Sequence, residues 1–194
     1  AWAGESGTLS TGQGGAHWLG AGMSLRGWAR AHQGYVREGV EQLLQGIAAW
    51  QATGAGLVLP YWWAMLAEAY QWAGQPEEGL RILATALAAG EHNHEPWWDA
   101  HLHWLKGELL LGQPGPQPAT QDAEAYFRQA LQIAHRQQAK SLELRATISL
   151  SRLWQHQGKR AEAHTLLAAI YGWFTEGFGT ADLQEAKILL EELA

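Results

Sequence analysis

Apolar and small residues recur at helical spacing through residues 60–89. The first run holds Trp63, Leu66, Ala67 and Tyr70, and the second holds Leu80, Leu83, Ala86 and Leu87. Between them stands the segment Ala73-Gly74-Gln75-Pro76. Glycine suits the left-handed position that ends a helix, and proline suits the first turn of the next one. The pattern therefore predicts a hairpin of two amphipathic helices.

The same spacing of small and large residues occurs four times along the chain. The four sets are Gly27, Gly39, Leu43 and Gly46; Ala67, Gly79, Leu83 and Ala86; Gly107, Ala123, Phe127 and Ala130; and Ser151, Ala163, Leu167 and Ile170. In the third set an extra loop, residues 112–118, separates the two helices. A small residue lets the partner helix approach closely, and a large one fills the space between neighbouring repeats. The sequence thus predicts four stacked hairpins. We call these four sets of residues the repeat template.

The other glycine, proline and capping residues along the chain set the expected ends of the helices. Helices are expected at about 17–33, 35–53, 97–111, 120–138, 141–157, 159–171 and 180–190, in addition to the pair within 60–89. Thr120, Ser141 and Thr180 are predicted N-caps. Residues 89–96 are expected to form a loop, and residues 1–16, rich in Gly, Ser and Thr, a flexible tail or linker. The last helix is expected to cap the fourth hairpin, so that residues 17–194 form one domain.

The central hairpin resembles a tetratricopeptide repeat (TPR). Trp63, Leu66, Ala67, Tyr70, Gly79, Leu83 and Ala86 fill the places of that motif in order, although the proline expected near residues 89–91 is missing. The resemblance implies an all-α fold, a right-handed α-α superhelix of about four TPR-like hairpins plus a C-terminal capping helix.

A more specific resemblance extends over about residues 23–194. The segments that carry it run from GYVREGVEQLLQGIAAWQATGA at 34–55, through LPYWWAMLAEAYQWAGQPEEGL at 59–80 and LHWLKGELLL at 102–111, to residues 123–163 and IYGWFTEGFGTADLQEAK at 170–187. They are similar to the C-terminal TPR region of bacterial multidomain signal-transduction ATPases, in which a cyclase-like or DNA-binding domain precedes the ATPase module. The resemblance implies a sensor or autoinhibitory arm, without cyclase or ATPase chemistry of its own.

Composition narrows the classes of function. The formal net charge of −6 argues against nonspecific binding to nucleic acid or anionic membranes. The absence of cysteine excludes disulfides, thiol catalysis and cysteine-type zinc sites. Neither a signal peptide nor a long apolar run is evident, so a cytoplasmic protein is expected. The chain begins at Ala1 without methionine, and a segment excised from a larger protein is one interpretation.

A histidine-rich segment, residues 91–103, carries the most suggestive chemistry. It holds His92, His94, His101 and His103 with three carboxylates, and these are good ligands for zinc or nickel. Histidines two positions apart on a helix point about 200° apart, so His101 and His103 cannot bind the same ion. We therefore favour a solvated loop beside a helix start over a metal site, and no residue pattern indicates a cofactor.

The first helix of each hairpin is expected to line a concave groove. Its predicted residues are Trp28, His32, Tyr61, Glu68, Trp72, His101, Trp104, Glu108, Arg145, Arg152 and His156. Aromatic residues and arginine are the types that anchor peptides and partner proteins. The alternative is that these rings only cover neighbouring helices. Trp63 and Trp154, by contrast, occupy packing places of the repeat.

Catalysis finds no support in the sequence. Ser149, Ser151 and His156 are near one another, but nothing positions a base or an oxyanion hole. The leading hypothesis is a non-catalytic interaction or regulatory module that binds a peptide, a partner protein or the upstream ATPase module of its own parent chain. Small-molecule effector sensing and homodimerisation are the alternatives that the sequence leaves open.

Overall fold

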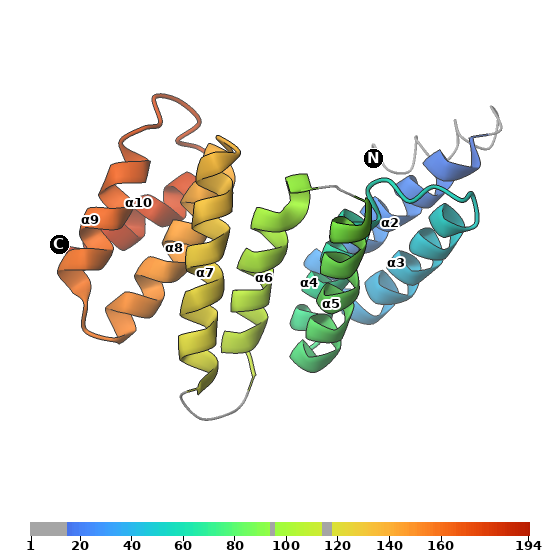
Figure 1. Ribbon diagram of the computed structural model, residues 1–194, viewed down its shortest axis with the longest axis horizontal. Helices are drawn as coiled ribbons and strands as arrows, with labels where there is room; N and C mark the ends of the chain where they lie inside the picture. The colour runs from blue at the N-terminus through green and yellow to red at the C-terminus, as the bar shows by residue number, and fades with distance from the viewer. Residues whose placement is uncertain (1–14, 94–95, 114–117) are drawn as a thin grey trace. The chain divides into compact units, whose positions relative to one another are not determined.

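The computed structural model describes residues 15–93, 96–113 and 118–194, and within these ranges every regular element is helical (Figure 1). Two compact units divide the chain at Trp98 and Asp99. The predicted all-α helical repeat is confirmed. The predicted tail, residues 1–16, lies outside the described residues except for its end, where the first helix already begins at Ala16.

Unit 1 contains two antiparallel hairpins. The first pairs α2 (Ala16–His32) with α3 (Val36–Gln51), and the second pairs α4 (Leu59–Trp72) with α5 (Pro76–Asn93), followed by the short 3-10 helix η1 (Pro96–Trp98). The loop predicted at 89–96 is wrong over its first half, because α5 continues to Asn93. Gly90 is buried inside that helix and does not end it.

Unit 2 contains two further hairpins and the capping helix. They are α6 (Asp99–Leu111) with α7 (Pro118–Arg136), α8 (Lys140–His156) with α9 (Arg160–Tyr171), and α10 (Ala181–Leu193), which packs on α8 and α9. Thr120 and Ser141 are not N-caps, since α7 and α8 begin before them. Thr180 does hold the N-cap position, but its hydroxyl bonds to the carbonyl of Gly177 and not to the helix.

The turns that follow α2, α4, α7 and α8 share one geometry. Gly74 adopts φ +68°, and the next amide, that of Gln75, donates to the carbonyl of Tyr70 at 2.9 Å. This is the 6→1 bond of a Schellman motif, which satisfies carbonyls that the helix end leaves free. The same bond and a positive φ recur at Gly34, Gln138 and Gly158. Gln138, at φ +57°, is the position where a side chain replaces the expected glycine.

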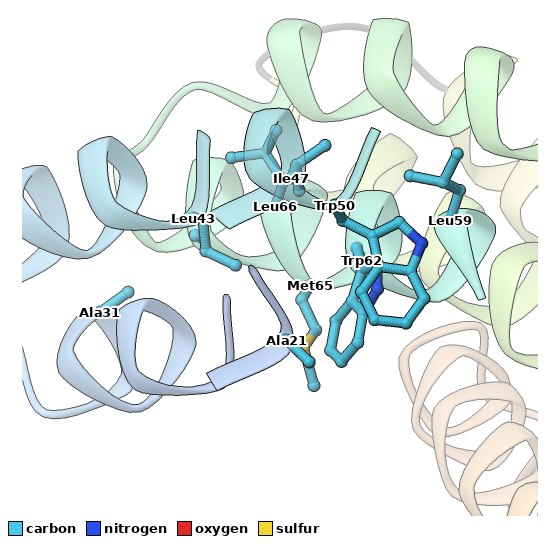
Figure 2. Close-up of a cluster of buried hydrophobic side chains, with 10 residues drawn as sticks. Ala21, Ala31, Leu43, Ile47, Trp50, Leu59, Trp62, Met65 and Leu66 are labelled. Carbon is cyan, nitrogen blue, oxygen red and sulfur yellow. The ribbon is translucent and has the colours of Figure 1, made fainter. Parts of the chain in front are cut away.

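All sixteen positions of the repeat template are buried. The core of unit 1 shows how the large residues use the space that the small ones leave (Figure 2). Leu43 and Leu66 are at most 1% exposed, and Trp50 and Trp62 meet edge to face with ring centroids 5.8 Å apart. In unit 2, Phe127 and Leu167 take the equivalent central places. Of the side chains predicted to line the groove, Trp28 and Tyr61 also pack against the core of unit 1, and Trp104 packs against that of unit 2.

Glycine pairs set the spacing of α2 and α3. A Cβ built on Gly39 would lie 2.6 Å from the amide nitrogen of Ala31 and 2.7 Å from the carbonyl of Gly27. One built on Gly46 would lie 2.6 Å from the amide nitrogen of Ser24. The two backbones touch along their length, which explains glycines that would otherwise weaken both helices.

Candidate functional site

The residues predicted to line a groove fall into two groups, one in each unit. Unit 1 holds Trp28 and His32 on α2 with Tyr61, Glu68 and Trp72 on α4. Unit 2 holds His101, Trp104 and Glu108 on α6 with Arg145, Arg152 and His156 on α8. Each group therefore lies on the first helices of its hairpins, and each is described separately below.

In unit 1 three rings and a carboxylate gather where α2 and α4 meet, and we call this set the ring–carboxylate cluster: Trp28, His32, Trp72 and Glu68. Trp28 stacks on His32 with centroids 5.4 Å apart, and Trp72 packs at 5.8 Å from Trp28 and 5.2 Å from His32. The indole N–H of Trp28 donates to Glu68 Oε2 at 2.6 Å. Sequence neighbours four apart on each helix, 28 with 32 and 68 with 72, supply the two halves.

Exposure differs within the ring–carboxylate cluster. Trp28 and Glu68 are partly buried, whereas His32 is exposed and Trp72 keeps 38% of its surface accessible. Tyr61 lies elsewhere on α4 and stacks on Trp98 with centroids 4.4 Å apart. The outer rings of the cluster can therefore contact a ligand, while the indole of Trp28 fixes the carboxylate.

In unit 2 a clasp joins α8 to α10. The guanidinium of Arg145 pairs with Asp182 at 2.9 Å and lies over the ring of Trp104, 5.2 Å from its centroid. About two helical turns further along α8, Arg152 pairs with Glu185 at 3.0 Å. Both pairs are half exposed, so each contributes at most about 1 kcal/mol in solution. Their main effect is to orient charged groups on one face.

A polar chain lies beside that clasp. The indole N–H of Trp104 donates to the hydroxyl of Ser149 at 2.9 Å, and Ser149 in turn hydrogen-bonds to Glu108. Burial raises the pKa of Glu108, and the charge of Glu185 adds to the rise, while the bond from Ser149 and the charge of Arg152 oppose it. Glu108 is thus a carboxyl group that holds its proton more tightly than a surface glutamate.

The two histidines of the unit 2 group have different environments. His101 is buried, with 8% of its surface exposed, and its ring stacks on Trp104 with centroids 5.4 Å apart. Burial, aided by the charge of Arg145, lowers the pKa of His101 to about 4, so the ring is neutral near pH 7. His101 therefore holds the ring of Trp104 in place and is itself too buried to contact a ligand. His156 is exposed at the end of α8.

Sequence reasoning missed the partners of these residues. The sequence predicted no partner for Arg145 or Arg152, which pair with Asp182 and Glu185 of α10. Asp182 and Glu185 are spaced three apart on α10, and Arg145 and Arg152 are seven apart on α8. Both spacings keep side chains on one helix face, so the sequence indicated a charged face on each helix but not that the two faces meet. Ser149 was considered only as a nucleophile.

The metal and catalytic hypotheses gain nothing from the geometry. Within the described part of the chain, His, Asp and Glu side chains form no group of three or more that could hold a metal ion. The side chains of residues 91–95 lie outside the described residues. The hydroxyl of Ser151 is buried and bonds to the carbonyl of Ala163, and that of Ser149 bonds to Trp104. None of the helices in the described part of the chain combines the length and apolar character needed to cross a bilayer.

The packing residues behave as the repeat requires. Trp63 packs on the core of unit 1, and Trp154 packs on two clusters of unit 2. The indole N–H of Trp154 also donates to Glu124 of α7 at 2.9 Å. Both tryptophans are partly buried, so they hold helices together and contribute little to an outer face.

No family model matches the sequence, and no curated protein matches it. Among solved structures, BtubC from P. vanneervenii superposes with a TM-score of 0.77 at 17% identity, covering 98% of this chain and 78% of that one. The nearly identical TPR-like repeats of a putative kinesin light chain from Podosopora anserina give a TM-score of 0.65 at 19% identity, covering 88% and 83% of the two chains. A variant of the same repeats gives 0.63 at 19% identity, covering 88% and 91%. The fold is therefore that of TPR-like helical repeats.

Proposed function

We propose that this chain is a non-catalytic interaction module that binds a peptide, or an extended segment of a partner protein, on the first-helix face of either of its units. The observation that carries the proposal is the exposure of large aromatic and paired charged side chains on those faces. Trp72 and Arg152 are the clearest cases, with 38% of the whole residue and 54% of the side chain exposed, respectively.

The chemistry of these faces suits an anchor-type interface. Tryptophan and arginine are the residues most often found where truncation costs the most binding energy. The hydrogen bonds from Trp28 to Glu68 and from Trp104 to Ser149 hold the rings in place before any ligand arrives. A face that is already ordered loses less side-chain entropy on binding, which favours affinity.

The partner in this proposal is a protein, and the segment that binds belongs either to a separate protein or to the ATPase module of the parent chain. The second option comes from the resemblance to signal-transduction ATPases, in which the repeat region would act as a regulatory arm. The alternative, sensing of a small-molecule effector, requires a site that encloses most of its ligand. A protein segment instead needs an open face.

A display selection tests the proposal. Random twelve-residue peptides are selected on the full chain, and the affinities of enriched peptides are then measured for variants of the face. We expect Trp72→Ala or Arg152→Ala to weaken binding about tenfold or more, the usual effect of losing an anchor residue.

Matched control variants separate the face from the rest of the surface. Trp173→Ala removes a tryptophan that follows α9 and is 57% exposed, and Arg128→Ala removes an arginine on α7 that pairs with Glu124 at 2.7 Å. Both controls are expected to bind the selected peptides as the unaltered chain does. Failure to enrich any peptide, or equal losses in the controls and the face variants, would refute the proposed function.

A further inference from the structure

The ring–carboxylate cluster of unit 1 presents two exposed rings that stand nearly at a right angle. The planes of His32 and Trp72 meet at 77°, with the ring centroids 5.2 Å apart, and both residues are exposed. Trp28 is partly buried and stacks on His32 with an interplanar angle of 25°. The two exposed rings therefore form a corner of aromatic surface that a third ring holds in place.

The charged groups around this corner are engaged or point elsewhere. Glu68 is the one charged residue of α4, and its Oε2 accepts from the indole N–H of Trp28 at 2.6 Å. Glu68 also has a further interaction besides this bond. Arg26 and Arg30 of α2 each lie two positions from Trp28, and residues two apart on a helix point about 200° apart. A neutral ligand group therefore suits the rings better than a charged one.

Proline is the neutral residue that best matches such a corner. It has no backbone N–H, so it leaves no unpaired donor when it is buried. Its C–H groups beside the amide nitrogen are electron-poor, and the faces of aromatic rings carry negative charge. Proline-rich segments also hold the extended polyproline II conformation before they bind, so they dock on aromatic-lined surfaces at a low cost in conformational entropy.

We infer that the ring–carboxylate cluster binds a proline side chain of the bound protein segment. The inference rests on the proposed function, and it names the chemistry of one subsite on the face of unit 1. The pyrrolidine ring packs between Trp72 and His32. The indole of Trp28 keeps the ring of His32 in position by stacking on it. Since the contact is apolar, the affinity should change little with salt.

Two short peptides and the full chain give the direct test. Acetyl-hexaproline amide is titrated into ¹⁵N-labelled protein, and the indole N–H signals are followed and assigned by single Trp→Phe variants. Acetyl-hexasarcosine amide also lacks backbone N–H groups but has no ring, so it is the matched probe. We expect hexaproline to move the signals of Trp28 and Trp72 with a dissociation constant on the order of millimolar, equally at about 0.05 M and 0.5 M salt, and hexasarcosine to move neither.

Three variants complete the design. Trp72→Ala removes an exposed indole and should weaken hexaproline about tenfold or more, as measured on the signal of Trp28. Trp72→Phe keeps an aromatic face and should restore most of the affinity. Trp173→Ala removes an exposed tryptophan of unit 2 and should leave the titration unchanged. Equal responses to the two peptides, a marked loss of affinity at the higher salt, or equal affinities in Trp72→Ala and Trp72→Phe would overturn the inference.

The selected peptides distinguish this inference from the proposed function. If peptides that depend on Trp72 carry a proline, and lose affinity when it becomes alanine, both statements stand. If such peptides depend on Trp72 yet lack proline, the interaction module stands and the proline subsite is wrong. If the selected peptides depend on Arg152 and not on Trp72, the module stands on unit 2 and the proline subsite is again wrong.

Discussion

Replacing Gly39 with alanine tests the claim that unit 1 is built on direct contact between the backbones of α2 and α3. The added Cβ would lie 2.6 Å from both the amide nitrogen and the Cβ of Ala31, and 2.7 Å from the carbonyl of Gly27. Ordinary contacts of a Cβ begin near 3.4 Å, so the helices would have to separate by several tenths of an ångström. Two of these three neighbours are backbone atoms and cannot rotate away.

The magnitude follows from two opposing effects. Alanine gains about 1 kcal/mol over glycine from helix propensity. Overpacking of a tight contact costs about 1–3 kcal/mol, and backbone neighbours place this site at the upper end. The net expectation is a loss of about 2 kcal/mol, which lowers the thermal midpoint by roughly 4–8 °C for a chain of this size.

Thermal unfolding followed by circular dichroism measures this loss. The control is Gly112→Ala, where the added Cβ would lie 3.5 Å from the carbonyl of Leu109, an ordinary contact. We expect Gly112→Ala to unfold at the same temperature as the unaltered chain or slightly higher. A Gly39→Ala protein that is as stable as the control would show that the two helices do not need the glycine contact.

Three further predictions concern unit 2. The low pKa of His101, about 4, predicts that the free energy of unfolding falls as the pH drops from about 6.5 towards 4, because the unfolded chain takes up the proton first. The expected loss at pH 5 is about 2 kcal/mol. Urea unfolding at pH 7 and pH 5 should show a smaller fall in His101→Gln than in His156→Gln. Arg145→Met removes the pair with Asp182 and should lower the free energy of unfolding by about 1 kcal/mol in the same assay, an effect that disappears in an Asp182→Asn background. Gln138→Gly relieves a side chain at φ +57° and should raise stability by about 1 kcal/mol, whereas no gain would mean that this turn is not strained.

Most of the fold could be predicted from the repeat template. Small and large residues at fixed offsets depend on helix geometry alone, so each template position could be assigned to the interior before its neighbours were known. The boundaries were less accurate where one residue type has two roles. Gly90 was interpreted as part of a loop, and it instead lies buried inside α5. Thr120 was interpreted as a cap, but Pro118 already opens α7.

The candidate site could be predicted only in part. Periodicity indicated which helix face each residue occupies, and it brought Trp28, His32, Glu68 and Trp72 to one face. It did not indicate depth, because the burial of His101 depends on helices distant in sequence. Nor did it pair Arg145 with Asp182, since α8 and α10 meet only after α9 has turned the chain back.

Photo-cross-linking tests the central claim, that the first-helix faces bind a protein segment, most directly. A display-selected peptide carrying a photoreactive residue is irradiated with the full chain, and mass spectrometry locates the linked residues. The account predicts linkage to the first helices of one unit, α2 and α4 or α6 and α8, with loss of the product in the face variant of that unit, Trp72→Ala or Arg152→Ala. Linkage confined to α3, α5, α7 and α9 would contradict it.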